Sequence, residues 1–151
     1  MAGVRDHTEL DCWRLSDQLQ IEIYRITSTR GFRSALDLKA QLIDAAESAT
    51  SNIAEGFSRY YPRDNARFVR IAKASLSEVI NRLRAALLRG LITEVDAAAL
   101  TTLARRARGA CTGLILYLER ANPPGREKAA GPRARSGNPG TPESGTKNPG
   151  T

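Results

Sequence analysis

The 151-residue sequence has little of what catalysis or metal binding most often requires: one histidine, two cysteines and only 5% aromatic residues. His7 stands in a polar segment, which argues against histidine catalysis and against a histidine-ligated metal. Two cysteines cannot form a disulfide framework, and no Cys-x-x-Cys pair or His-rich tract indicates a metal site. No apolar run approaches the roughly 18 residues of a membrane span, and residues 1–10 are too polar for a signal peptide. We therefore expect a cytoplasmic protein without metal, cofactor or membrane contact.

Positive charge is in excess along the whole chain. The net charge is +7, with 18 basic against 14 acidic residues in 1–120 and five against two in 121–151. A basic balance of this kind favours anionic partners such as RNA or DNA over other ligands. Charge alone indicates a class of partner and no particular molecule.

The composition changes abruptly after Arg120. Asn-Pro-Pro-Gly ends any helix there, and the Gly-, Pro- and Ser-rich segment that follows contains Asn-Pro-Gly-Thr twice, at 138–141 and 148–151. Such a segment cannot bury enough apolar surface to offset its ordering entropy. The sequence therefore predicts three parts: a flexible leader at 1–10, a folded unit at 11–120 and a disordered basic tail at 121–151.

Helical periodicity fills the folded unit, and no strand-like alternation competes with it. Apolar residues recur at steps of three and four along four segments: about 11–29, 34–55, 62–89 and the segment that begins after Thr93. Gly31, Gly56 and Gly90 are placed to end the first three helices, and Pro62 suits the first turn of the third. Thr93 is the predicted N-cap of the fourth. Short connections make consecutive helices antiparallel, so we expect an all-α, up-down-up-down four-helix bundle.

Each segment offers one apolar face for the core. In the second segment this face contains Leu38, Leu42, Ala45, Ala49 and Ile53. In the fourth, a strict alternation of three and four predicts a packing seam through Leu100, Leu103, Ala107, Ala110, Leu114 and Tyr117.

The third segment separates an apolar face from an arginine-rich one. Residues 59–89 contain eight basic side chains and two acidic ones, and a second basic cluster follows at 105–108. Arginine stripes can follow a phosphate backbone, because each guanidinium offers a fork of donors. The predicted nucleic-acid-binding residues are Arg63, Arg67, Arg70, Lys73, Arg84, Arg105, Arg106 and Arg108. The alternative is a solvated helix face that is simply rich in arginine.

Two blocks of the folded unit resemble a known family. The string Ser-Asn-Ile-Ala-Glu-Gly-Phe at 51–57 is similar to the hallmark of the 23S rRNA intervening sequence proteins, also called S23-like. The run at 67–78, Arg-Phe followed by Ile-Ala-Lys-Ala-Ser-Leu-Ser-Glu, resembles the family's third-helix block. Trp13, Tyr24 and Gln41 are further matches, so the resemblance covers about 11–120.

The resemblance implies a four-helix bundle that commonly assembles as a homopentamer with a basic surface suited to nucleic acid. The accessory proteins of diversity-generating retroelements look like the same architecture; they assist a reverse transcriptase and bind nucleic acid without being enzymes. Two departures matter: Asp44 stands where the family often has a basic residue, and Ala74 where it often has glycine. Asp44 weakens the case for a basic surface on the second helix, and Ala74 bears on how closely a neighbouring subunit approaches.

The polar members of the two blocks are Asn52, Glu55, Ser75 and Glu78. One interpretation pairs the two glutamates for acid–base chemistry or a metal. The favoured one is a structural polar network that ties the second helix to the third, because two carboxylates without histidine or a nucleophile are too few for catalysis. We therefore expect no catalytic residues.

Three further pairs of residues need an interpretation, and for the first two an alternative stays open. Tyr60 and Tyr61, flanked by arginines, either stack on unpaired bases or, as is more common, pack their loop against the end of the bundle. Ile21 and Tyr24 either meet a neighbouring subunit or are ordinary exposed apolar residues. For Cys12 and Cys111 we expect separate buried thiols, at different heights on neighbouring helices.

These observations predict a non-catalytic, homo-oligomeric accessory protein that contacts RNA or DNA backbone through a basic helical face. The first alternative is an adaptor whose basic face docks a protein such as a reverse transcriptase. The second is a carboxylate hydrolase that uses Glu55 and Glu78. A HEPN-type ribonuclease bundle is less favoured than either alternative, because its usual Arg-x4-His pair has no suitable histidine in this sequence.

Overall fold

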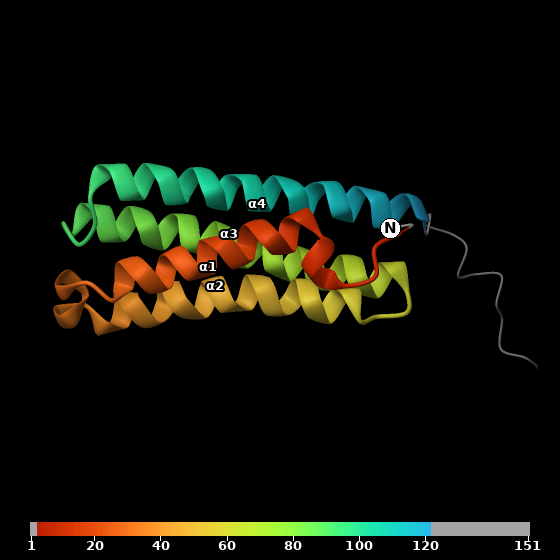
Figure 1. Ribbon diagram of the computed structural model, residues 1–151, viewed down its shortest axis with the longest axis horizontal. Helices are drawn as coiled ribbons and strands as arrows, with labels where there is room; N and C mark the ends of the chain where they lie inside the picture. Colours follow the sequence, from red (N-terminus) through yellow and green to blue (C-terminus); the bar gives the residue numbers. More distant parts are fainter. Residues whose placement is uncertain (1–2, 122–151) are drawn as a thin grey trace, which may run out of the picture.

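The computed structural model describes residues 3–121, which form four α-helices and two short 3₁₀ helices. In chain order these are η1 (His7–Glu9), α1 (Asp11–Thr27), η2 (Arg30–Ser34), α2 (Leu36–Phe57), α3 (Pro62–Leu88) and α4 (Glu94–Ala121). The α-helices lie side by side along the long axis (Figure 1), and no strand occurs within the described range. The predicted all-α fold is confirmed. The predicted disordered tail lies outside the described residues, apart from Ala121 at the end of α4.

Neighbouring helices pack in antiparallel order. Contacting pairs reverse their sequence order across these interfaces. Tyr24–Glu47 and Gln20–Thr50 join α1 to α2, Ser48–Ser75 and the close approach of Gly56 to Asn65 join α2 to α3, and Arg70–Glu119 and Ser77–Arg108 join α3 to α4. The helices contact one another in the cyclic order α1, α2, α3, α4 and back to α1. The α3–α4 side therefore lies across the bundle from the α1–α2 side. None of the helices in residues 3–121 has the length and apolar character needed to cross a membrane.

The core is built from one apolar stripe on each helix, as amphipathic periodicity predicts. All five predicted positions of α2, from Leu38 to Ile53, are buried. On the apolar face of α3, Phe68 is half-buried and the other positions are buried: Ala72, Leu76, Val79, Leu83 and Ala86. Phe32 of η2 is also fully buried, so this 3₁₀ helix covers part of the core where the chain passes from α1 to α2.

The second half of the predicted α4 seam is wrong. Tyr117, a predicted seam position, is 48% exposed. The buried positions each lie one residue later than the predicted ones, at Cys111, Ile115 and Leu118. A strict alternation of three and four averages 3.5 residues per turn, whereas a straight helix has 3.6. Over a helix of 28 residues the core-facing position therefore drifts away from a strict heptad.

The predicted ends of α3 are confirmed. Pro62 occupies its first turn, where a missing N–H leaves no hydrogen bond unmade. At the other end Gly90 adopts φ +68°, in the left-handed region. The Leu91 N–H donates to the carbonyl of Ala86 at 2.9 Å, and the Gly90 N–H donates to Leu87 at 3.0 Å. This pair of bonds is a Schellman motif, which needs a residue in the left-handed conformation, and only glycine adopts that conformation without strain.

The predicted N-cap of α4 is confirmed as well. The Thr93 hydroxyl accepts a hydrogen bond from the Asp96 N–H at 3.1 Å and donates to the Asp96 carboxylate at 3.2 Å. Threonine and aspartate thus satisfy the first turn of the helix, and the aspartate places negative charge at its positive end.

The end of α1 departs from the predicted boundary. The helix stops at Thr27, and Gly31 lies within η2 instead of capping it. The hydroxyls of Thr27, Ser28 and Thr29 each donate to a backbone carbonyl of the preceding turn at 2.7–2.8 Å. These hydroxyl groups bond to the last carbonyls of the helix, which would otherwise accept the N–H groups of a further turn. The run of three hydroxyl residues therefore ends α1 before Gly31.

Gly56 is not the C-cap of α2, because the helix continues to Phe57; its start, at Leu36, is also later than predicted. Gly56 is buried and faces α3. A Cβ atom on it would lie 2.8 Å from Asn65 Oδ1 and 3.0 Å from the Cβ of Phe68. Real Cβ atoms do not approach other atoms so closely, so the missing side chain is what allows α2 and α3 to meet here.

We predict that Gly56→Ala destabilises the fold by about 1–3 kcal/mol, because the new methyl group overpacks the α2–α3 contact. Gly109→Ala is the matched control: Gly109 lies within α4, and a Cβ atom on it would have no neighbour within 4 Å. That substitution should stabilise the protein by about 1 kcal/mol through helix propensity alone. Urea unfolding of both variants measures the difference, and equal effects of the two substitutions would contradict the packing argument.

Candidate nucleic-acid interface

The outward face of α3 carries most of the predicted binding residues. Arg63, Arg67, Arg70 and Arg84 are exposed, and Lys73 is half-buried. They lie away from the buried stripe of the same helix, as the periodicity predicts. The basic face is therefore open to solvent along the length of α3.

Arg84 and Arg105 line an open groove between α3 and α4, with a volume of about 450 Å³. Leu87 and Ala98 contribute apolar surface to this α3–α4 groove, and Glu94 is its acidic residue. Within residues 3–121 neither arginine forms an ion pair or a side-chain hydrogen bond. Two guanidinium groups that form no ion pair and share one groove are suited to an anionic group such as a phosphate, which they can bind through several donors.

Two of the predicted binding residues are engaged across the α3–α4 interface. Arg70 forms an ion pair with Glu119, and Arg108 Nη1 donates to the Ser77 hydroxyl at 3.3 Å. Both partners come from the facing helix. A phosphate would therefore have to replace Glu119 before it could bind Arg70, whereas Arg84 and Arg105 require no such exchange.

Arg106 is separated from this groove. It lines a second pocket, of about 270 Å³, between α1 and α4, together with Arg25, Glu22 and Asp96. The two carboxylates make this pocket a poor site for an anion. The structure thus brings Arg84 and Arg105 together on one side of α4 and places Arg106 on another, so the eight predicted residues do not form one patch.

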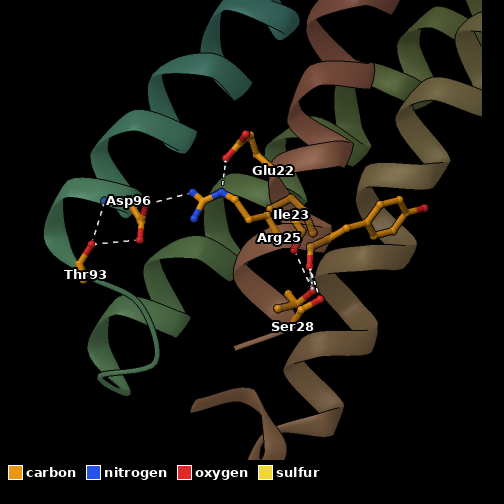
Figure 2. A network of polar contacts seen from close by, with 8 residues as sticks. Glu22, Ile23, Arg25, Ser28, Thr93 and Asp96 are labelled. Carbon is orange, nitrogen blue, oxygen red and sulfur yellow. Dashed lines mark hydrogen bonds and ion pairs between the residues drawn. The ribbon is translucent and has the colours of Figure 1, made fainter. Parts of the chain in front are cut away.

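A polar network at the second pocket ties α1 to the start of α4, and Figure 2 shows Arg25 reaching from one helix to the other. Arg25 Nε lies 2.7 Å from a Glu22 oxygen, and Arg25 Nη2 lies 3.2 Å from Asp96 Oδ1. Glu22 and Asp96 raise the pKa of Arg25 further above its ordinary value. Because Asp96 also bonds to Thr93, the network joins an interhelical ion pair to the N-cap of α4.

Ser75 and Asn52 belong to one hydrogen-bond network, joined by a residue that the sequence did not single out. The hydroxyls of Ser48 and Ser75 lie 2.8 Å apart across the α2–α3 interface. The Asn52 amide donates to the Ser48 carbonyl at 2.7 Å and to its hydroxyl at 3.1 Å. Three small polar side chains thus connect the two helices, and Ser75 is buried.

Glu55 and Glu78 do not take part in this network. Glu55 pairs with Arg59 and Glu78 with Arg82, each four residues later on its own helix or just past its end, and the second contact measures 3.5 Å. The carboxylates therefore face separate arginines, not each other or a common substrate. In the part of the chain that the structure describes, no group of three or more His, Cys, Asp or Glu side chains could hold a metal ion.

The segment predicted to be a flexible leader makes contacts with the bundle. Asp6 caps η1, and the hydrogen bonds from Thr8 lower the pKa of the Asp6 carboxylate. The ring of His7 packs edge-on against Trp13, with centroids 5.2 Å apart, and Leu10 is buried. His7 thus lies among aromatic rings and not beside a nucleophile or a ligand set.

Cys12 and Cys111 are free and buried, as expected, but the prediction that they lie at different heights is wrong. The two thiols lie close enough across the α1–α4 interface to interact with each other. This interaction lowers the pKa of Cys12, and the interaction and burial together raise the pKa of Cys111. The pairing of α1 with α4 sets the relative height of the two thiols, and no spacing within either helix indicates it.

The fold and its basic face define a class of protein: a four-helix bundle with an arginine-rich α3–α4 surface. A family model, described as 23S rRNA-intervening sequence protein, matches residues 8–113. The chain belongs to this family. No curated protein matches the chain significantly.

Sequence reasoning missed Ser48, Ser77 and Glu119. Ser48 lies one helical turn before Asn52, so the i, i+4 spacing was available as a signal. Ser77 and Glu119 meet their arginines only through the pairing of α3 with α4. No pattern within either helix indicates that contact, so it could not have been predicted.

We predict that Ser48 and Ser75 are energetically coupled, whereas Glu55 and Glu78 are not. A double-mutant cycle with Ser48→Ala and Ser75→Ala should give a coupling free energy of about 0.5–1.5 kcal/mol, the usual net value of a hydrogen bond. The cycle with Glu55→Gln and Glu78→Gln should give a value close to zero. Coupling between the glutamates as large as that between the serines would restore the network that the sequence predicts.

Proposed function

We propose that this protein is a non-catalytic nucleic-acid-binding accessory protein that contacts the phosphate backbone of RNA or DNA through its α3–α4 face and works as a homo-oligomer. The observation that carries the proposal is the α3–α4 groove, where Arg84 and Arg105 stand together without carboxylate partners. Arg67 extends the same positive surface along the exposed side of α3.

Arginines of this kind bind phosphates largely without regard to base sequence. Each neutralised phosphate releases condensed counterions, so the observed affinity falls as salt rises. Contacts to phosphates fix position and orientation but carry no base information. The proposed activity is therefore salt-dependent binding with little sequence preference, which suits an accessory role.

The homo-oligomer is supported by the family resemblance, which implies a homopentamer, and by apolar surface on α1. Ile21 is 57% exposed and lies one turn before Tyr24. The Tyr24 hydroxyl donates to Glu47 at 2.5 Å, and this bond raises the pKa of the phenol. The ring is thereby fixed beside Ile21 on the surface. Several copies of one weak basic face, held in one assembly, would gain affinity through effective concentration.

We predict that replacing Arg84 and Arg105 together with glutamine weakens binding to RNA and DNA and lowers the salt slope by about one per lost phosphate contact. The matched control replaces Arg30 and Arg33 of η2, which also removes two positive charges, but from a 3₁₀ helix that packs on α2 and does not line the groove. Fluorescence anisotropy at several salt concentrations measures both effects, with mass checked by light scattering.

Equal losses in the two double variants would show that only net charge matters and would contradict a binding face on α3 and α4. A wild-type protein that binds no nucleic acid at low salt would overturn the proposal. The arginine face would then be a candidate docking surface for an acidic protein, such as the reverse transcriptase partner of the first alternative.

The substitution Glu119→Gln should strengthen nucleic-acid binding, whereas the arginine substitutions weaken it. It removes the carboxylate that pairs with Arg70, and because exposed ion pairs contribute little to stability, unfolding should change by less than about 1 kcal/mol. We predict tighter binding at low salt and a salt slope steeper by up to about one, since Arg70 becomes available to a phosphate. Unchanged binding would place Arg70 outside the interface.

A further inference from the structure

We infer that the ligand of this face is single-stranded nucleic acid and that Tyr60 and Tyr61, in the loop between α2 and α3, stack on its unpaired bases. The inference rests on the proposed function and adds the class of ligand to it. It concerns residues outside the α3–α4 groove and depends on observations of its own.

The two tyrosines stand out from the bundle. Tyr60 is 90% exposed and Tyr61 is 63% exposed. The alternative that they pack their loop against the bundle end is therefore wrong. Their rings meet edge to face, with centroids 5.1 Å apart and an interplanar angle of 89°. This contact covers at most one face of one ring, so aromatic surface stays open on both residues.

The loop that carries the rings is short and fixed at both ends. At the α2 end, the Ser58 N–H donates to the Ala54 carbonyl at 3.2 Å and the Arg59 N–H to Gly56 at 3.0 Å. Pro62 follows Tyr61 directly and restricts it to an extended backbone, observed at φ −91° and ψ 132°. The backbone that carries the two rings is thus held in place before any ligand arrives, which lowers the entropy cost of stacking.

Arg59, which precedes Tyr60 in the chain, does not cover the two tyrosine rings. The Arg59 guanidinium lies 4.8 Å from the centroid of the Phe68 ring and pairs with Glu55. It is therefore held against α2 and α3, and the tyrosine faces remain accessible. Within residues 3–121 neither tyrosine hydroxyl forms a hydrogen bond, so no internal contact explains why two large rings stand in water.

Charge complementarity selects nucleic acid as the occupant. The loop and the first turns of α3 contain Arg59, Arg63 and Arg67 against Asp64 and the Glu55 that pairs with Arg59, so one net positive charge remains at this end. Arg67 lies about 6 Å further along the axis of α3 than Arg63, on the face that leads toward the rest of the basic surface. A strand whose phosphates follow α3 would therefore bring its bases to the tyrosines.

Only a strand with unpaired bases can use such rings. Aromatic side chains stack on single-stranded bases with little sequence preference, because every base has a π-face. In a duplex the base faces are already covered by their neighbours, so the rings gain nothing beyond contact with the outside of the helix. The same protein should therefore prefer single strands, while duplex binding depends on the arginines alone.

The test compares two double variants of the full chain, Tyr60→Leu with Tyr61→Leu, and Tyr60→Phe with Tyr61→Phe. We expect the leucine variant to bind a single-stranded oligonucleotide about 10-fold more weakly and a duplex of the same length within about 2-fold of wild type. The phenylalanine variant keeps both rings and should bind either ligand within about 2-fold. A 2-aminopurine base in the single strand should be quenched on binding to the phenylalanine variant and not to the leucine variant.

A leucine variant that loses single-strand and duplex affinity equally, or loses neither, would overturn the stacking role, as would a phenylalanine variant as weak as the leucine one. In each of these cases the salt-dependent binding of the wild type still stands, so the proposed function survives. If wild type binds neither ligand at low salt, both the proposed function and this inference are overturned.

Discussion

The close contact of α2 with α3 at Gly56 is the constraint on which the arrangement of the α2–α3 loop and of the α3 surface depends. Asn65 and Phe68 press against the glycine at distances that no side chain could tolerate. Because the two helices meet so closely one residue before α2 ends, the chain must reverse within the few residues that hold Tyr60 and Tyr61. The same contact fixes the rotation of α3 about its axis. That rotation decides which of its residues are buried and which arginines face outward.

The arginines divide according to what the folded chain gives them as neighbours. Arg25 and Arg70 have carboxylates on a facing helix, so their charge is already compensated. Exposed ion pairs contribute little to stability, and their main effect here is to remove those guanidinium groups from competition for an anion. Arg84 and Arg105 share a groove without such partners. The difference between structural and available positive charge is therefore a property of tertiary packing, and counting basic residues along the chain overstates the binding surface.

The sequence was sufficient to predict those features of the fold that depend on residues close together in the chain. Pro62 and Gly90 act through the backbone of one turn, and periodicity within α3 was enough to separate its apolar face from its basic one. Gly56 has the same local signature as a C-cap glycine, but its role is set by a side chain of another helix. Nor could periodicity show that Arg106 faces α1 or that Glu119 compensates an arginine of α3. Each of these facts depends on which side chains two helices bring together, and composition leaves several such pairings equally possible.

The two parts of the proposed interface supply different kinds of information. Phosphate contacts from Arg84 and Arg105 are insensitive to base identity and to strandedness. Stacking on Tyr60 and Tyr61 is also insensitive to base identity, but it requires a base that is free of its partner. A surface that combined the two would discriminate by the state of the nucleic acid and not by its sequence. Such discrimination fits an accessory protein better than a sequence-specific regulator. A partner enzyme that acts on single strands would need a protein that recognises unpaired bases, whatever their sequence.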